Sequence, residues 1–222
     1  SRVVIVGGGP AGSFAALHLL RLAQAASLRL DVTLLEARDF NRPGPGGCNK
    51  CAGILSSSAV RNLHTLGLTL PPDVIQSELD AYVLHLGGTQ LPIHRPDAAR
   101  RIFSGYRGSG PRLGEPPFPR SFDGWLLDQA RERGADVRRV RVQSIRPGLR
   151  PIVATAHEQL EADLVILATG VNSRAPVDPA WGYRPPRTET MAQDEVSLPG
   201  GFLDESVHIF FDHLPGLIFG GL

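Results

Sequence analysis

The chain opens with the stretch Val3-Val4-Ile5-Val6-Gly7-Gly8-Gly9-Pro10-Ala11-Gly12, which decides the fold. Four aliphatic residues in a row predict a buried parallel strand, and three glycines at GxGxxG spacing close it. Pro10 predicts a helix start, because its missing N–H costs nothing at that position. In such a turn Gly7 allows the bend, Gly9 admits a phosphate, and Gly12 lets helix and strand pack closely. The free N–H groups and the positive dipole of the helix start then favour a pyrophosphate.

The context makes this turn more specific than an isolated glycine motif. Apolar residues at helical spacing follow it, and then comes a second strand, Asp31-Val32-Thr33-Leu34-Leu35-Glu36. Glu36 lies where a dinucleotide-binding fold places a carboxylate on the ribose hydroxyls of the adenosine. A carboxylate there favours a free ribose diol and would repel a 2′-phosphate. The sequence therefore predicts a real nucleotide site.

Composition sets wide bounds on the rest. The 222 residues suffice for one large domain or two interleaved domains, and a net charge of +1 gives no reason to expect nucleic acid as a partner. No apolar run reaches the ~18 residues that span a bilayer. Two cysteines do not make a disulfide framework. We expect a cytoplasmic protein, with peripheral membrane contact left open. The abrupt start at the first strand also leaves room for a removed leader.

Further helices and strands follow in alternation. Helices are expected over residues 10–26, 54–66 and 122–133, the last capped by Ser121 and stopped by Gly134. Residues 105–119 are expected to be irregular. Strands are expected over residues 79–86 and 90–94, which form a hairpin, and over 137, 140–145, 152–156, 162–170, 189–198, 207–211 and 217–222.

Four signatures in this order resemble the two-domain flavoproteins of the para-hydroxybenzoate hydroxylase and geranylgeranyl reductase type. They are the Gly7–Gly12 turn, Glu36, the helix start Arg120-Ser121-Phe122-Asp123, and Ala168-Thr169-Gly170 after a strand. The loop Cys48-Asn49-Lys50-Cys51-Ala52-Gly53 is more similar to geranylgeranyl reductase-like oxidoreductases than to hydroxylases.

The resemblance implies an α/β fold with a Rossmann-like FAD-binding domain, in which a parallel sheet carries a ββα layer. An interleaved, sheet-rich substrate domain is expected beside it. The expected FAD-binding domain comprises residues 1–78 and 115–175, and the expected substrate domain comprises 79–114 and 176–222. A second Gly-Asp signature of these flavoproteins is missing from the sequence, and we expect the chain to be incomplete at its C-terminal end.

The resemblance also implies roles for single residues. Glu36 would hold the ribose, and Arg120 would reach the phosphate or the ribityl chain unless it is a surface cation. Val142 would meet the adenine through its backbone unless it is a core residue. The full set of expected cofactor-binding residues is Gly7, Gly9, Pro10, Ala11, Gly12, Glu36, Ala52, Gly53, Arg120, Val142, Thr169 and Gly170.

Cys48 and Cys51 are the candidate catalytic residues, as a redox pair near the flavin. A CxxC pair can exchange with a disulfide, and Lys50 beside it would favour the thiolate. Two alternatives remain open. The loop can need small residues only for its shape, or the pair can be half of a zinc site with His64 as a third ligand. No second cysteine pair is present, so no metal is expected.

The implied activity is electron transfer through FAD that reduces a carbon–carbon double bond in a small hydrophobic, isoprenoid-like substrate. The electron donor would be NAD(P)H or a small electron carrier. His85 and His94 in the second sheet could face the substrate, but a lone histidine in a strand is more often an ordinary strand residue, so neither is nominated as catalytic. The alternatives are a flavin-dependent monooxygenase or halogenase, a flavin-binding electron-transfer module without its own substrate, and a plain NAD-binding domain.

Overall fold

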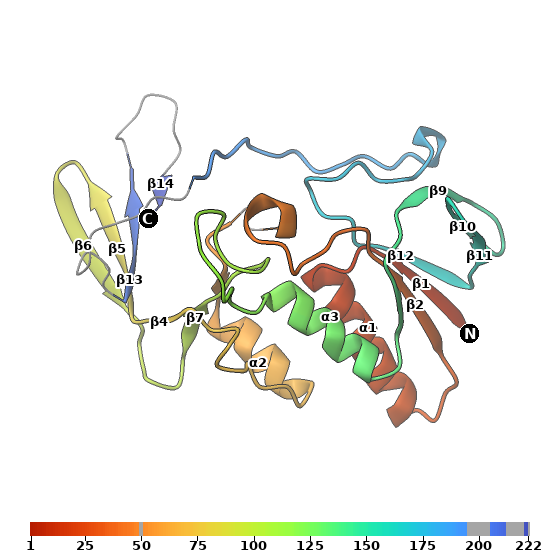
Figure 1. The fold of residues 1–222 in the computed structure, drawn as a ribbon, viewed down its shortest axis with the longest axis horizontal. Coiled ribbons are helices and arrows are strands. Elements are labelled where there is room, and N and C mark those ends of the chain that lie inside the picture. Colours follow the sequence, from red (N-terminus) through yellow and green to blue (C-terminus); the bar gives the residue numbers. More distant parts are fainter. Residues whose placement is uncertain (49–50, 195–204, 212–219, 222) are drawn as a thin grey trace.

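The computed structural model, which describes residues 1–48, 51–194, 205–211 and 220–221, is built around a four-stranded parallel sheet (Figure 1). Its strands lie in the order β12 (Leu164–Leu167), β1 (Arg2–Val6), β2 (Asp31–Leu35) and β8 (Asp136–Arg138). Ile5 pairs with Ile166 on one side and with Leu34 on the other. The aliphatic run at the start of the chain is therefore a buried parallel strand, as predicted, and it lies inside the sheet.

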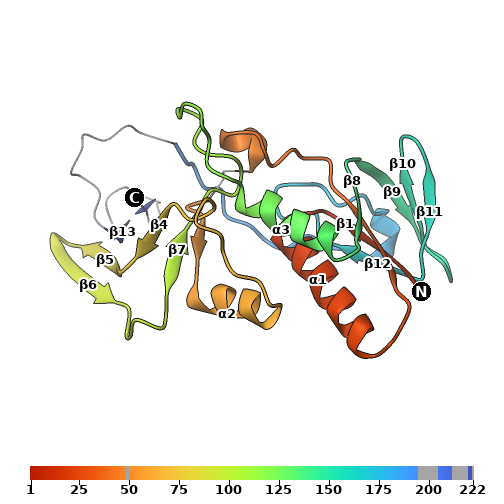
Figure 2. The same cartoon turned by 60° about the horizontal axis from the view of Figure 1, so that its bottom comes forward.

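Alternate residues of β1 face two different layers, because successive side chains of a strand point to opposite faces. Val3 and Ile5 join the core formed with helices α1 (Pro10–Ala25) and α3 (Phe122–Glu132). Val4 and Val6 join a second core with an antiparallel sheet made of β9 (Val142–Arg146), β10 (Ile152–Thr155) and β11 (Gln159–Glu161). Figure 2 shows the two helices and the small sheet on opposite sides of the parallel sheet. The predicted parallel sheet with a ββα layer is confirmed.

The helices begin where their caps place them. Ser121 accepts a hydrogen bond from the Gly124 N–H at 3.0 Å, as expected for the start of α3. Helix α2 (Ser57–Thr65) begins later than predicted, because the Ser56 side chain accepts from the Ala59 N–H. The preceding residues form the short strand β3 (Ile54–Leu55) instead of a first helical turn.

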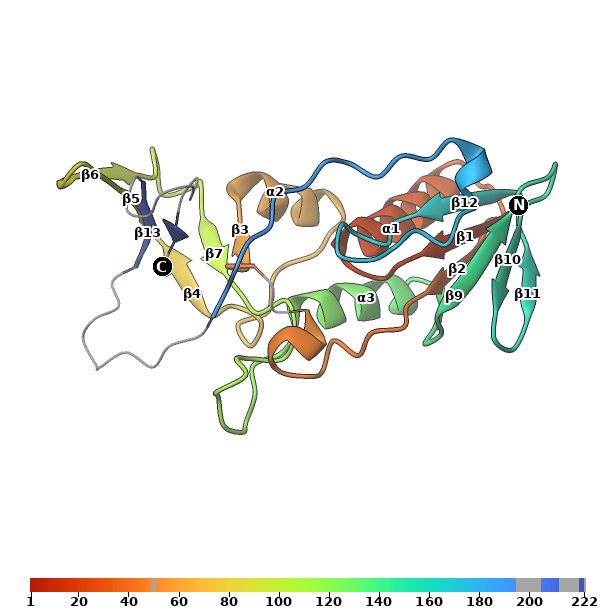
Figure 3. The ribbon, with the colours of Figure 1, turned by 90° about the horizontal axis from the view of Figure 1, so that it is seen from above.

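A second group of strands lies at the other end of the molecule from β9–β11 (Figures 1 and 3). One sheet has the order β14 (Gly220–Gly221), β13 (Ser206–Phe210), β5 (Ala81–Leu86) and β6 (Thr89–His94). The predicted hairpin between β5 and β6 is confirmed. A smaller sheet has the order β3, β7 (Ile102–Ser104) and β4 (Ser77–Leu79).

The expected strand over residues 189–198 is wrong for the part that the structure describes. Residues 189–194 are exposed and irregular, and they contact no neighbouring strand that would complete a ladder. Residues 195–198 and 217–219 lie outside the described residues. The short strand β11 was not predicted at all. The domain limits given above stay a prediction.

Two short 3₁₀ turns complete the described elements, η1 (Gly44–Gly47) and η2 (Pro179–Trp181). Within the described ranges, no helix has both the length and the apolar character needed to cross a membrane.

Candidate functional site

The glycine turn lies at the carboxyl end of β1 and is closed by the end of β12. Gly7 has a φ of +109°, and a side chain there would overlap the carbonyl oxygen of Ala168. A side chain at Gly12 would overlap the carbonyl oxygen of Gly7. Both positions therefore require glycine, and the end of β12 packs directly against the turn.

The start of α1 is open on one side. Gly9 is the N-cap, no side chain caps the helix, and Pro10 occupies the first turn. A Cβ atom added to Gly9 would meet only Asp123 Oδ2, at 4.0 Å. The N–H groups of this helix end are thus available to an anion, and the helix dipole favours one. This open cradle fits one diphosphate group.

Glu36 is fixed against the glycine turn. Its Oε2 accepts a hydrogen bond from the Gly8 N–H at 2.6 Å, and its Oε1 accepts from the Arg38 N–H at 2.7 Å. The carboxylate therefore holds the turn in shape as well as standing where a ribose is expected.

The Arg107–Asp123 ion pair lies beside the open side of the turn, and sequence reasoning missed its role. Arg107 Nε and Nη2 donate to the two oxygens of Asp123, with Nη2 at 2.7 Å from Oδ2. The Asp123 side chain is 0% exposed and that of Arg107 is 25% exposed. In the sequence, Asp123 belongs to the helix-start signature, which does not indicate a partner for it. Arg107 lies in an irregular loop, where no sequence pattern indicates a role.

The electrostatics of this pair follow from its burial. Removal from water raises the pKa of Asp123, and the contact with Arg107 opposes that rise. Desolvation works against the charge of Arg107, but its hydrogen bonds to Asp123 raise the pKa of the guanidinium above its usual value. The pair is therefore a two-pronged carboxyl–guanidinium contact that is largely removed from water.

The two cysteines both interact with Arg107 but differ in environment. Cys48 is half-buried with a φ of +96°, and burial raises the pKa of its thiol. Cys51 is exposed, and Arg107 Nη1 lies 3.8 Å from its Sγ. Lys50, expected to favour the thiolate, lies outside the described residues. Among the residues that are described, no group of three or more His, Cys, Asp or Glu side chains is arranged to hold a metal.

Ala52 and Gly53 continue this loop toward the second half of the chain. Gly53 has a φ of +67°, and its carbonyl accepts from the Gly105 N–H at 3.0 Å. A side chain at Gly53 would overlap the Gly105 carbonyl oxygen. This close approach fixes the cysteine loop to the segment that carries Arg107.

The structure places the remaining expected residues around the sheet. Arg120 pairs with Asp73 at 3.8 Å and with Asp128 at 4.0 Å. Val142 starts β9 and lines an open hollow of about 680 Å³, together with residues 174–178 and Trp181. Thr169 and Gly170 follow the residue that closes the glycine turn, and Gly170, with a φ of +72°, borders open space. Their cofactor roles stay predictions.

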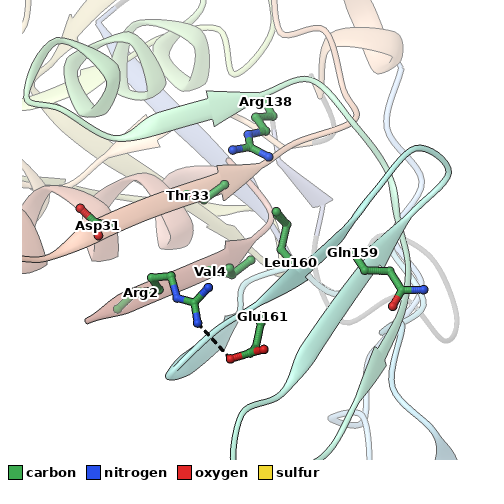
Figure 4. Close-up of a pocket in the computed structure, with 9 residues that line it drawn as sticks. Arg2, Val4, Asp31, Thr33, Arg138, Gln159, Leu160 and Glu161 are labelled. Atoms are coloured by element: carbon green, nitrogen blue, oxygen red, sulfur yellow. Dashed lines mark hydrogen bonds and ion pairs between the residues drawn. The ribbon is translucent and has the colours of Figure 1, made fainter.

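A second cavity, of about 320 Å³, lies between the parallel sheet and β11 (Figure 4). It is lined by the first residues of β1 and β2, by β11 and by Arg138, and its Arg2 and Glu161 form an ion pair at 3.0 Å. Ligands of open α/β sheets bind at the carboxyl ends of the strands. This cavity is therefore not the nucleotide site.

The histidines considered for substrate contact lie in the distal sheet. His85 Nε2 and His208 Nδ1 are 2.9 Å apart, and the rings of His85 and Phe210 stack with centroids 4.2 Å apart. His94 Nδ1 lies 3.6 Å from Asp80 Oδ2. Their positions alone assign them no chemistry.

Comparison with known proteins finds matches over most of the chain. Residues 2–53 match the tryptophan halogenase family. The protein FixC of Salmonella typhi is 30% identical over 175 residues, which are 77% of this chain and 36% of FixC. The chain thus spans about a third of the length of this curated relative.

Solved structures show the same fold. A geranylgeranyl bacteriochlorophyll reductase-like protein of Thermoplasma acidophilum superposes with a TM-score of 0.61 and 18% identity, over 95% of this chain and 50% of that one. The tetrameric form of 2-methyl-3-hydroxypyridine-5-carboxylic acid oxygenase superposes with a TM-score of 0.55 and 24% identity, over 82% of this chain and 42% of that one.

Proposed function

We propose that this chain is a member of the FAD-dependent oxidoreductase superfamily and binds FAD at the glycine turn. The observation that carries the proposal is the uncapped start of α1 with open space at Gly9. Backbone N–H groups there would hold the diphosphate of the cofactor, and Glu36 would hold its ribose. Bound FAD would supply the capacity to accept and pass on electrons, while the protein binds and orients it.

The test is cofactor retention by the purified protein. Gly9→Val should abolish flavin retention, because its side chain fills the space that the diphosphate needs. Ala26→Val adds methyl groups at the other end of α1 and should retain the flavin. Identification of a released flavin by absorbance and mass supports the proposal. Normal retention by Gly9→Val would remove this role from the turn.

Glu36 allows a finer test of the ribose contact. Glu36→Gln keeps the shape and a hydrogen-bond acceptor for the turn, whereas Glu36→Ala removes both the acceptor and the charge. We expect flavin affinity to fall in both variants and to fall further in Glu36→Ala, as measured by flavin fluorescence. Undiminished affinity in Glu36→Ala would show that the ribose is held elsewhere.

For the reaction we propose reduction of a carbon–carbon double bond in a small hydrophobic, isoprenoid-like substrate. The similarity of the cysteine loop to geranylgeranyl reductase-like sequences and the likeness of fold over 95% of the chain support this choice. Electrons would come from NAD(P)H or a small carrier. Reduction of an isoprenoid diphosphate or isoprenoid lipid without oxygen is the test, and strict dependence on oxygen would contradict it.

A flavin-dependent monooxygenase or halogenase is the second candidate. The match of residues 2–53 to the tryptophan halogenase family favours it. Its signature would be oxygen consumption in proportion to a hydroxylated or halogenated product, with halide required in the latter case.

A further inference from the structure

Arg107 lies in an irregular loop, but hydrogen bonds from both its side chain and its backbone fix its position. Its side chain makes the two-pronged contact with Asp123 described above, and its carbonyl accepts a hydrogen bond from Ser121 Oγ at 2.6 Å. The neighbouring Tyr106 carbonyl accepts from the Phe122 N–H at 2.8 Å. Backbone and side chain are therefore both tied to the start of α3, and the guanidinium has one defined orientation.

The remaining guanidinium nitrogen is directed at a thiol. Arg107 Nη1 lies 3.8 Å from Cys51 Sγ, on the exposed side of the loop. Because Asp123 cancels the formal charge of Arg107, the effect on the sulfur is that of a directed N–H donor rather than of a net positive field. A donor at this position stabilises the thiolate, which is the reactive form of cysteine.

We propose that Cys51 is the attacking thiol of a thiol–disulfide exchange site, with Arg107 and Asp123 as its positioning residues and Cys48 as the resolving thiol. Cys51 faces solvent, whereas Cys48 is half-buried among Arg38, Asp123 and Arg107. An incoming disulfide can thus reach Cys51 first. The site goes beyond the proposed flavin chemistry, because exchange itself needs no cofactor.

The substrate class is a small disulfide, R–S–S–R. The Cys51 thiolate attacks one sulfur, the S–S bond of the substrate breaks, a Cys51–S–S–R bond forms, and RS⁻ leaves. Cys48 then loses its proton to solvent and attacks Cys51 Sγ, which releases a second RS⁻ and leaves a Cys48–Cys51 disulfide. Two electrons pass from the cysteines to the substrate, and an external dithiol returns the pair to its reduced form.

Competitive alkylation of the reduced protein tests the order of the two thiols. Trypsin cleaves after Lys50 and so puts Cys48 and Cys51 on different peptides, which mass spectrometry can quantify separately. With limiting iodoacetamide at neutral pH we expect Cys51 to be labelled severalfold faster than Cys48, because Cys51 is exposed whereas burial disfavours the thiolate of Cys48. Equal rates, or faster labelling of Cys48, would overturn the proposal.

Variants of Arg107 test the positioning role. Arg107→Gln should slow the labelling of Cys51 and move its pH profile to higher pH, and Arg107→Lys should restore part of the rate. Arg112→Gln, in the same loop but paired at the surface with Asp194, should change neither. A merely loosened loop would instead speed the labelling of Cys48. An unchanged pH profile for Cys51 in folded Arg107→Gln would remove Arg107 from the site.

A small aromatic disulfide tests the second step. Wild-type protein should end with a Cys48–Cys51 disulfide, and Cys48→Ser should accumulate a mixed disulfide on Cys51. A mixed disulfide that persists in the wild type would contradict resolution by Cys48. Flavin content is measured in the same samples and should be unchanged in Cys48→Ser and Cys51→Ser, so failure of the thiol site and failure of flavin binding give different results.

Discussion

At the residue scale, the Arg107–Asp123 pair is a salt bridge in which the carboxyl group is fully buried and the guanidinium is partly buried. Such a pair contributes little net stability when intact, but removal of one partner leaves an uncompensated charge in the interior. The contrast with α3's exposed pair between Arg131 and Asp128 is useful, because that contact is surrounded by solvent.

We therefore expect Asp123→Ala to lower the free energy of unfolding by about 3 kcal/mol. Asp128→Ala, which removes only exposed partners, should cost no more than about 1 kcal/mol. Urea unfolding followed by circular dichroism measures both. The double variant Asp123→Ala/Arg107→Gln should be more stable than the sum of the single losses predicts, and strict additivity would show that the two side chains do not interact.

Gly9 and Gly12 of the first turn are expected to differ sharply in how much stability is lost when a side chain is added. Gly12→Ala places a methyl group against the Gly7 carbonyl and should cost about 1–3 kcal/mol of stability, because backbone atoms must move. Gly9→Ala meets only open space up to Asp123 and should unfold within about 0.5 kcal/mol of the wild type. Thermal unfolding distinguishes them, and equal stabilities would contradict the geometry of the turn.

Residue roles were predictable where a local pattern imposes them. The spacing of Gly7, Gly9 and Gly12 indicated the turn, and the structure explains two of these glycines by backbone overlap. Arg107 had no such pattern, because its partner is set by how an irregular loop crosses the start of α3. Long-range contacts of this kind leave no periodic trace in a sequence.

At the element scale, the two serine N-caps are expected to contribute different amounts to the stability of the fold. Ser121 accepts from the Gly124 N–H at 3.0 Å and also donates to the Arg107 carbonyl, and the side chain is buried. Ser56 accepts from the Ala59 N–H at 3.3 Å at the surface. Ser121→Ala should cost about 2 kcal/mol and Ser56→Ala about 0.5 kcal/mol, the two ends of the usual range. Comparable losses in chemical denaturation would contradict this ranking.

The small sheet β3-β7-β4 carries a pH-dependent contact. Glu78 accepts hydrogen bonds at 2.6 Å from Arg101 and from Arg95, and these lower the pKa of its carboxyl from 4.5 to about 2. A lowered pKa means that the contact stabilises the fold above about pH 4.5 and loses this effect as the pH falls toward 2.

Glu78→Gln should therefore be less stable than the wild type at neutral pH, with the difference shrinking steadily below about pH 4.5. Urea unfolding at a series of pH values measures it. A difference that stays constant down to the acid limit would show that Glu78 titrates normally in the folded protein.

Helix starts were predictable where the residues before the N-cap do not continue the apolar spacing of the helix. Ser121 follows a proline-rich segment and marked α3 correctly. Ser56 was hidden, because Ile54 and Leu55 continue the apolar spacing of α2 while they pair with β7. The strand β11 was missed because three residues of a meander have too short a pattern to be seen.

At the scale of the whole molecule, the exposed segment 182–194 follows η2 and contains no strand or helix. Arg187 stands in this segment before Thr188, whereas Arg184 precedes Pro185 and is protected from trypsin. We expect trypsin to cut first after Arg187, and Arg187→Gln to delay the first cut. Electrophoresis and mass spectrometry identify the first cut and its rate. Initial cleavage elsewhere would contradict the exposure of this segment.

The parallel pairing of β5 with β13 could not be predicted from the sequence, because it is a contact between distant parts of the chain. Both strands were predicted, yet their registry, with His85 opposite Phe210, joins residues more than a hundred positions apart. The overall class was predictable, because the strand–turn–helix at the start of the chain admits few architectures.

The closure of Gly7 by the Ala168 carbonyl has a consequence for biosynthesis. The glycine turn and the carbonyl that packs against it are about 160 positions apart, so the ribosome releases residues 7–12 well before residue 168. The Ala168 side of the turn can therefore form only after β12 has been synthesised and has paired with β1.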